Sequence, residues 1–380
     1  MEPGERLVLA HEDAGALNTS IIEDAELRAL IADVTTCASN RAVARFLLAC
    51  TLAKWHQPEV DILKPYTEIG GPDAYSGRTF DERYVTPFRT RYQLPLNPTT
   101  AFLTPAFRNI NRPLSSKTVF EGRPREAYTK AVQVLEAVQE GRVTAREVLT
   151  EAVRQLLLLR DAERARLGGQ LEVLRNRNVE AEVRLSSEDI FTLLVQHLQS
   201  RNASRLPVLV VKAVYDTLTD CLKEAALPLG SHNAADAQTG SLGDVEITLH
   251  EGGRVVTVYE VKDRRVTTED LDYALAKLTA LERLPDNYLF ITTQTIEKEV
   301  ADHAKAMYDQ TGGVEFAVLD CLGFARHFLH LFHRSRQAFL NHYQELVLSE
   351  PPSAVRQELK EVWLALRNNA EAAYIAARST

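Results

Sequence analysis

The sequence contains only four cysteines, and no two of them form a Cys-x-x-Cys pair. That spacing is typical of zinc sites and dithiol redox centres, so both classes are disfavoured. Apolar runs long enough to span a membrane, about 18 residues, are also missing. The first residues, MEPGERLVLAHEDAG, carry early acids and lack the apolar core of a secretory signal. We therefore expect a cytoplasmic protein with no membrane partner, in which the thiols are reduced and pack as small hydrophobic groups; they are Cys37, Cys50, Cys221 and Cys321.

Neither an internal repeat nor a low-complexity tract is present, and the chain has no overall excess of positive charge. Its 380 residues carry a formal net charge of −8, so contact with nucleic acid would require a local basic surface. Hydrophobic residues make up 45% of the chain and charged residues 25%, as in an ordinary globular protein. The length exceeds that of one typical domain, so we expect two domains.

The N-terminal half alternates between helical and loop-rich patterns. Apolar residues recur at helical spacing in 21–56 and again in 127–167. Between these segments, residues 57–125 contain nine prolines, which prevent long helices and interrupt central strands. The capping box Thr144–Glu147 and the pair Gly168–Gly169 predict the start and the end of a helix, ahead of a charged helical connector.

The C-terminal half mixes helical and strand patterns. Ser187 is a candidate N-cap of one helix, and Pro207 suits the first turn of the next. Further elements are expected in the order hairpin (243–264), helix (268–284), strand (287–292), helix (296–310), strand (314–319) and terminal helices. This order predicts an α/β (α+β) fold, with a mixed sheet flanked by helices. We therefore divide the chain into a helical and loop-rich region, 1–182, and a second domain, 183–380.

The hairpin sequence GDVEITLHEGGRVVTVYEVKDR carries three charged side chains near one end. A three-residue loop with Gly253 in a left-handed conformation pairs Asp244 with Glu260. This register gives one continuous apolar face, through the pairs Val245–Tyr259, Ile247–Thr257 and Leu249–Val255. Side chains alternate along a strand, so Lys262 shares a face with Glu260. Asp244, Glu260 and Lys262 are therefore expected to converge at one edge of the sheet.

Two carboxylates a few ångströms apart repel each other unless a cation lies between them. Oxygen ligands suit Mg²⁺, which keeps part of its hydration and accepts a phosphate oxygen. We expect Asp244, Glu260 and the main-chain carbonyl of Val261 to hold the ion. Lys262 would orient or deprotonate the attacking water and stabilise the charge that develops on phosphorus. The alternative interpretation is an ordinary cross-strand Glu–Lys pair on the surface.

Three other acids are candidate ligands. Glu188 lies in the first turn of the helix that begins the second domain, where the helix dipole alone also favours a carboxylate. Asp236 and Glu246 compete with Asp244 for the ion. Asp244 ranks first because it opposes Glu260 where the strand begins.

Asp244 and Glu260-Val261-Lys262 lie on a predicted hairpin, with a helix before it and a helix and a strand after it. This pattern resembles the PD-(D/E)xK nuclease superfamily over roughly residues 185–330. His232–Asp236 and three N-terminal segments are similar to the SacI family of type II restriction endonucleases; the segments are KPYTEIGG (64–71), SGRTFDE (76–82) and TAFLTPAFRNINRPL (100–114). The resemblance implies Mg²⁺-dependent cleavage of double-stranded DNA at a short palindrome, with Asp244, Glu260 and Lys262 as the catalytic residues.

Basic residues are concentrated in the loop-rich region. Between Arg78 and Arg125 there are nine basic and three acidic residues. Arginine suits guanine edges and phosphates, and asparagine suits adenine. The candidate DNA-binding residues are Arg78, Arg83, Arg108, Asn109, Asn111 and Arg112. The alternative is a loop-rich lid or dimer surface with solvated arginines.

Cleavage of both strands of a palindrome with one active site per chain requires two chains, so we expect a two-fold homodimer. Two other classes stay open. One is a DNA repair or branched-DNA nuclease with the same catalytic layer. The other is a non-catalytic DNA-binding module on a nuclease fold, although such modules usually lose the lysine or an acid, and Asp244, Glu260 and Lys262 are all present.

Overall fold

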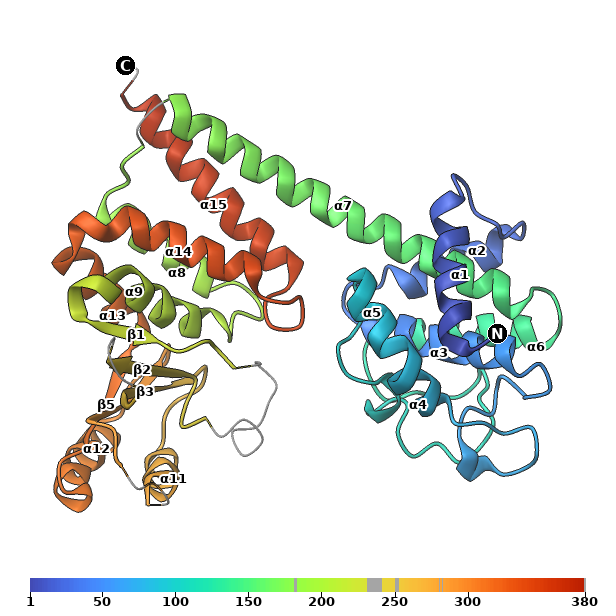
Figure 1. Cartoon of the computed structure of the whole chain (residues 1–380), viewed down its shortest axis with the longest axis horizontal. Helices are drawn as coiled ribbons and strands as arrows, with labels where there is room; N and C mark the ends of the chain where they lie inside the picture. Colours follow the sequence, from blue (N-terminus) through green and yellow to red (C-terminus); the bar gives the residue numbers. More distant parts are fainter. Residues whose placement is uncertain (181–182, 231–240, 250–252, 280, 282, 379–380) are drawn as a thin grey trace. The chain divides into compact units, whose positions relative to one another are not determined.

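The computed structural model divides into two compact units, Met1–Ala165 and Arg166–Thr380 (Figure 1). It describes residues 1–180, 183–230, 241–249, 253–279, 281 and 283–378. The division between the units lies at residue 165, whereas the sequence patterns suggested 182. None of the helices in these ranges is both long and apolar enough to cross a membrane.

The first unit consists of helices and short irregular elements. Its longer helices are α1 (Pro3–Ala16), α2 (Ala25–Thr35), α3 (Arg41–His56), α6 (Arg125–Gln139) and the beginning of α7 (Ala145–Glu180). Between α3 and α6 the elements are short, as predicted; they are η1 (Thr67–Ile69), α4 (Gly77–Phe80), the π-helical turn η2 (Asp81–Val85), α5 (Thr86–Tyr92) and η3 (Ala101–Leu103). Helix α3 is buried along most of its length and forms the centre of this unit.

The predicted start of helix α7 is confirmed, and its predicted end is wrong. Thr144 and Glu147 form the capping box, in which each side chain accepts a hydrogen bond from the other residue's main-chain N–H. The helix then continues through Gly168–Gly169 to Glu180. Glycine costs about 1 kcal/mol in a helix interior. Burial of Leu174 in the core of the second unit favours the continued helix over the expected break.

The second unit is built on a five-stranded mixed sheet in the order β1-β2-β3-β4-β5. The strands are β1 (Glu224–Ala226), β2 (Val245–Leu249), β3 (Val255–Lys262), β4 (Asn287–Thr292) and β5 (Glu315–Asp320). Strands β1, β2 and β3 are antiparallel, and β3, β4 and β5 are parallel. The predicted mixed sheet is confirmed, and β1 is an addition to the prediction.

Helices cover both faces of this sheet (Figure 1). One face packs on α8 (Ser187–Leu198), α9 (Leu206–Leu222), α13 (Cys321–Leu331), α14 (Arg336–Ser349) and α15 (Gln357–Ala376), with the turn η4 (His333–Ser335) before α14. The other packs on α11 (Thr268–Leu278) and α12 (Lys298–Thr311). Along β3, Tyr259 joins the first core and Val258 the second. Because side chains alternate, Glu260 and Lys262 lie on the same face as Val258, toward α11.

The hairpin register agrees with the prediction near Asp244 and differs from it near the turn. Two of the three predicted apolar pairs are present, Val245–Tyr259 and Ile247–Thr257. A β-bulge between Ile247 and Thr248 makes Thr248, and not Leu249, the partner of Val255. Gly253 has a positive φ of 22°, while the preceding turn residues lie outside the described ranges. The bulge is on the turn side and leaves the Asp244 end in the predicted register.

Candidate functional site

Glu260 and Lys262 lie together near the end of β3. The ammonium of Lys262 donates to Glu260 Oε1 at 2.8 Å. The side chain of Lys262 is only 25% exposed, and that of Glu260 is only 13% exposed. Partial burial reduces solvent screening, so this pair interacts more strongly than an ion pair in open solvent.

Asp244 directly precedes β2, and its carboxylate reaches the backbone of β3. Its main-chain N–H donates to Tyr259 O at 2.8 Å, and its Oδ2 accepts from the N–H of Val261 at 2.8 Å. Burial raises the pKa of the Asp244 carboxyl, and the nearby negative charge of Glu260 adds to the rise. The hydrogen bond from Val261 and the positive charge of Lys262 oppose this rise in the pKa. The structure thus brings Asp244, Glu260 and Lys262 into one cluster.

Gly243 explains how Asp244 comes so close to β3. A Cβ atom at position 243 would lie 2.8 Å from Tyr259 O and 2.6 Å from Val258 Cγ1. Both distances are shorter than real Cβ atoms adopt, and the carbonyl belongs to the backbone of the central strand. Only glycine therefore fits this approach without moving β2 away from β3.

Tyr288 and Glu246 hold the segment before β2. Glu246 Oε1 accepts from Ser241 Oγ at 3.0 Å and from Leu242 N–H at 2.5 Å. This carboxylate thus shapes the approach of Asp244 to β3. Tyr288, on β4, is fully buried; its hydroxyl donates to Leu242 O at 2.9 Å and lies 3.3 Å from Glu260 Oε2. The sequence analysis did not single out Tyr288, although a buried tyrosine hydroxyl usually has a polar partner.

A second lysine also approaches Glu260. Lys277 extends from α11, and its Nζ lies 3.7 Å from Glu260 Oε2. Its side chain is 15% exposed. The sequence around Lys277 does not distinguish it from an ordinary exposed lysine of a helix. Nothing in that local sequence indicates that α11 packs beside the end of β3.

Glu188 lies in a separate cluster. It is in the first turn of α8, which begins one residue before the predicted position because Ser186, and not Ser187, is the N-cap. Its carboxylate accepts from His330 at 2.5 Å and from two nitrogens of Arg326, each at 3.0 Å. The hydrogen bonds from His330 and Arg326 lower the pKa of Glu188. These contacts engage both of its oxygens with α13.

Side-chain geometry alone does not mark a metal centre. Within the part of the chain that the structure describes, no three His, Cys, Asp or Glu side chains are grouped closely enough to hold a metal ion. The predicted set contains three such side chains, Asp244, Glu260 and Glu188, together with the main-chain carbonyl of Val261. Glu188 lies apart from the other two, in the cluster with Arg326 and His330. Asp236 and the segment His232–Asp236 lie outside the described residues.

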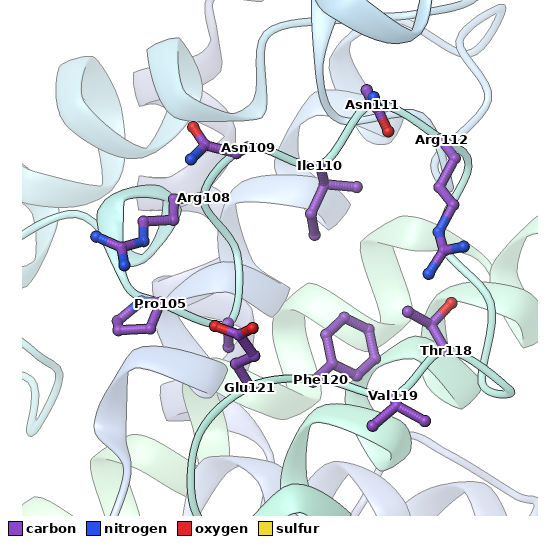
Figure 2. Close-up of a pocket in the computed structure, with 11 residues that line it drawn as sticks. Pro105, Arg108, Asn109, Ile110, Asn111, Arg112, Thr118, Val119, Phe120 and Glu121 are labelled. Carbon is purple, nitrogen blue, oxygen red and sulfur yellow. The ribbon is translucent and has the colours of Figure 1, made fainter.

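The candidate DNA-binding residues of the first unit are mostly gathered at one exposed loop. Four of them line a hollow of about 420 Å³ together with Phe120 and Glu121; they are Arg108, Asn109, Asn111 and Arg112. Figure 2 shows Arg112 extending toward Thr118, with Arg108 and Asn109 on the opposite side of the hollow. The loop therefore presents donors and acceptors to solvent in several directions.

The two other candidates differ in position. Arg78 lines a neighbouring hollow of about 290 Å³, which shares Arg108, Asn109 and Asn111 with the first hollow. It also forms an exposed ion pair with Glu82 at 2.8 Å. Arg83 lines a different hollow between α1 and α5, and its guanidinium lies over the Tyr84 ring. The structure thus joins Arg78 to the exposed loop and places Arg83 elsewhere.

Buried contacts anchor the exposed loop at both ends. Phe107 is fully buried and stacks on Phe46, with ring centroids 3.8 Å apart. At the other end, Leu114 N–H donates to Leu63 O at 2.8 Å. Asn109 adopts a left-handed φ of 59°, which asparagine tolerates better than most residues. An exposed polar loop on a rigid base is a common arrangement for recognition.

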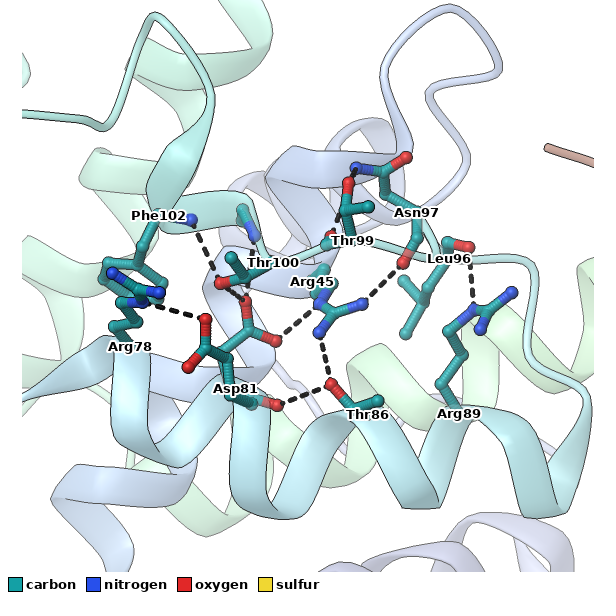
Figure 3. A network of polar contacts seen from close by, with 12 residues as sticks. Arg45, Arg78, Asp81, Thr86, Arg89, Leu96, Asn97, Thr99, Thr100 and Phe102 are labelled. Atoms are coloured by element: carbon teal, nitrogen blue, oxygen red, sulfur yellow. Dashed lines mark hydrogen bonds and ion pairs between the residues drawn. The ribbon is translucent and has the colours of Figure 1, made fainter. Parts of the chain in front are cut away.

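A buried ion pair fixes the segment that precedes this loop (Figure 3). Arg45 and Asp81 are 1% and 0% exposed, and Arg45 Nε donates to Asp81 Oδ1 at 2.5 Å. Arg45 also donates to the carbonyls of Asn97 and Pro98, at 2.7 and 2.8 Å. Asp81 Oδ2 accepts from Thr100 Oγ1 at 2.6 Å. These contacts connect α3, η2 and residues 97–100.

Residues 182–293 match the family model described as the SacI restriction endonuclease C-terminal domain. The predicted similarity to the SacI family is thereby confirmed for this part of the chain, which contains Asp244, Glu260 and Lys262. The match does not include segments 64–71, 76–82 and 100–114, whose similarity stays a prediction. No curated protein matches the chain significantly. The second unit thus carries a domain of the restriction endonuclease type.

Proposed function

We propose that the chain is a type II restriction endonuclease, which hydrolyses phosphodiester bonds of double-stranded DNA at a short palindromic site with the help of Mg²⁺. The observation that carries this proposal is the Asp244–Glu260–Lys262 cluster, within the segment similar to the SacI domain. The hairpin followed by a helix and a parallel strand also supports a PD-(D/E)xK core. In this proposal Asp244, Glu260 and Lys262 are the catalytic residues.

The chemistry of the cluster fits a divalent cation. Asp244 and Glu260 supply hard oxygen ligands. Their mutual repulsion, which helps to raise the pKa of Asp244, is relieved by a positive ion between them. The carbonyl of Val261 is the third proposed ligand, since the N–H of the same residue already faces Asp244. When bound, Mg²⁺ would polarise the scissile phosphate and lower the pKa of a coordinated water.

The remaining steps belong to side chains of the chain itself. Lys262 lies beside Glu260 and is placed to orient the attacking water or to stabilise the negative charge that develops on the phosphate. Asp244 is fixed by the N–H of Val261, so its orientation does not depend on substrate. Glu188 remains a weaker proposal as a ligand, because Arg326 and His330 engage its carboxylate.

We assign DNA recognition to residues 1–182 and catalysis to residues 183–380, which is the division made from the sequence. Exposed Arg108, Asn109, Asn111 and Arg112, with Arg78 beside them, are the proposed contacts to bases and phosphates. Arg83 is a weaker proposal because it lies in a different hollow. Two chains related by a two-fold axis would match the symmetry of a palindrome. The four cysteines are free thiols, which suits a cytoplasmic enzyme.

The test is incubation of the purified protein with a sequenced plasmid, in Mg²⁺ and in EDTA, followed by mapping of all cut ends. We expect discrete fragments in Mg²⁺, ends at one repeated palindrome, and no cutting in EDTA. Lys262→Ala should still bind DNA and no longer cut it. The matched control is Lys298→Ala, which removes an exposed lysine paired with Asp302 on α12 of the same unit.

Other outcomes would contradict specific parts of the proposal. Random nicking would indicate a repair or structure-selective nuclease instead of a restriction enzyme. DNA binding without any cutting would indicate a non-catalytic module. Equal loss of cutting in Lys262→Ala and Lys298→Ala would remove the evidence that the cluster is the active site.

A further inference from the structure

Glu260 is shared between two lysines that come from different elements. Lys262, on β3, contacts Oε1 at 2.8 Å, and Lys277, on α11, lies 3.7 Å from Oε2. Each lysine thus approaches a different oxygen of one carboxylate. The reaction proposed above uses only Lys262, so the position of Lys277 needs its own explanation.

Helix α11 holds Lys277 in this position through packing and capping. The buried residues Leu271, Ala274 and Leu278 form its inner face, at the spacing of one helical stripe. Its N-terminus is fixed by a capping box between Thr267 and Asp270. The stem of Lys277 thus begins beside the buried stripe and reaches the end of β3 along a fixed direction.

The side chain of Lys277 has further support. Its ammonium lies 5.2 Å from the centre of the Tyr273 ring, one turn earlier on the same helix. Only 15% of the side chain is exposed. A partly buried ammonium close to a carboxylate interacts with it more strongly than an exposed one does.

The two lysines cannot have the same role during the reaction. To contact the phosphate, Lys262 must share or give up its hydrogen bond to Glu260. Glu260 would then stand beside the half-buried Asp244 without its closest positive partner. The Lys277 ammonium approaches the other oxygen, so it can hold Glu260 throughout this exchange.

We propose that Lys277 is a positioning residue that orients Glu260 through an ion pair and leaves Lys262 available for the scissile phosphate. This inference rests on the proposed nuclease function. As a fixed positive charge beside a proposed metal ligand, Lys277 also weakens the binding of a divalent cation in the absence of DNA. Its loss therefore has two opposite effects: slower cleavage and tighter binding of the ion.

The test compares Lys277→Met, which removes the charge, with Lys277→Arg, which keeps it. We expect Lys277→Met to lower kcat on the order of 10- to 100-fold, the range for a reacting group displaced by about 1 Å, with DNA affinity unchanged. Lys277→Arg should recover most of that loss. The matched control, Lys298→Met, removes a lysine that is 87% exposed and should cleave like the parent protein.

Calorimetric titration with Ca²⁺, without DNA, gives a second measurement that does not depend on activity. Lys277→Met should bind Ca²⁺ more tightly by about threefold or more, because a like charge has been removed from the site. Lys277→Arg and Lys298→Met should bind Ca²⁺ as the parent does. A purely structural role for Lys277 would predict weaker binding of the ion and no rescue by arginine.

The outcomes separate this inference from the function on which it rests. If the parent cuts DNA and Lys262→Ala does not, normal cleavage by Lys277→Met overturns the role of Lys277 alone. Equal impairment of Lys277→Met and Lys277→Arg overturns it as well. If the parent does not cut DNA, the proposed function fails, and the Ca²⁺ titration decides: unchanged or weaker binding by Lys277→Met overturns the inference.

Discussion

The buried pair of Arg45 and Asp81 offers a quantitative test of how the first unit is held together. Replacing Arg45 by methionine keeps much of the buried stem and removes the guanidinium. Asp81 then loses the donor at 2.5 Å, and the carbonyls of Asn97 and Pro98 lose theirs. Burial already raises the pKa of Asp81 even with Arg45 present. Removing one member of such a pair typically costs about 3–5 kcal/mol, so Arg45→Met should lower the free energy of unfolding by about that amount.

Intrinsic fluorescence can assign the change to this unit. The chain has two tryptophans, Trp55 in α3 of the first unit and Trp363 in α15 of the second. In a Trp363→Phe background, fluorescence during urea unfolding reports on Trp55 alone. The control is Arg78→Met, which breaks an exposed ion pair with Glu82 in the same unit. Exposed pairs contribute less than about 1 kcal/mol, so its midpoint should hardly move.

A double variant tests whether charge burial is the cause. Arg45→Met combined with Asp81→Asn removes both charges, so its destabilisation should be clearly smaller than the sum of the two single effects. Strict additivity, or a single Arg45→Met effect below about 1 kcal/mol, would refute the reasoning. We also expect weaker DNA binding by Arg45→Met, because the pair anchors residues 97–100 ahead of the exposed loop.

Three further predictions concern other parts of the molecule. His197 is buried, its Nε2–H donates to Leu359 O, its Nδ1 accepts from Tyr343 OH, and burial lowers its pKa to about 4. Because the unfolded chain takes up this proton near pH 6.5 and the folded one does not, the second unit should lose about 2 kcal/mol of stability between pH 6.5 and 5. Urea unfolding followed by Trp363 fluorescence measures this slope, and an equally steep slope in His197→Gln contradicts it. Gly243→Ala should destabilise the second unit by about 1–3 kcal/mol through overpacking against β3, and should slow cleavage; a thermal midpoint and a cutting rate equal to the parent's would show that the close approach is unimportant. Arg108→Ala should weaken specific DNA binding by about 1–3 kcal/mol in a gel-shift titration, and Arg83→Ala by less, since only Arg108 lies on the exposed loop; the reverse order would move the interface to the hollow between α1 and α5.

The sequence predicted the hairpin well because its two strands have an unambiguous alternating pattern. A shift of one residue would have placed Val245 or Tyr259 against charges, so few registers were available. The bulge after Ile247 was not predictable in the same way, since the alternating pattern carries no signal for one extra residue in β3. Strand β1 itself was missed because three residues are too few to show a period.

The contacts around the cluster were harder to predict than the cluster itself. Tyr288 reaches Glu260 from β4, so its position depends on the order of the strands in the sheet. Lys277 reaches Glu260 from α11, so its position depends on how that helix packs against the sheet. Local sequence carries no such information. The helix end predicted at Gly168–Gly169 failed for a related reason, since packing of Leu174 outweighs the local preference of glycine.

The most direct test of the central claim is the rate of double-strand cleavage by Asp244→Asn in Mg²⁺. Asparagine keeps the shape of the side chain and removes its charge, and its amide oxygen can still accept from the N–H of Val261. We predict a drop in the rate of at least about 100-fold with unchanged DNA affinity, while Asp302→Asn, on α12, cleaves normally. Cleavage by Asp244→Asn at the parent rate would contradict the proposed active site.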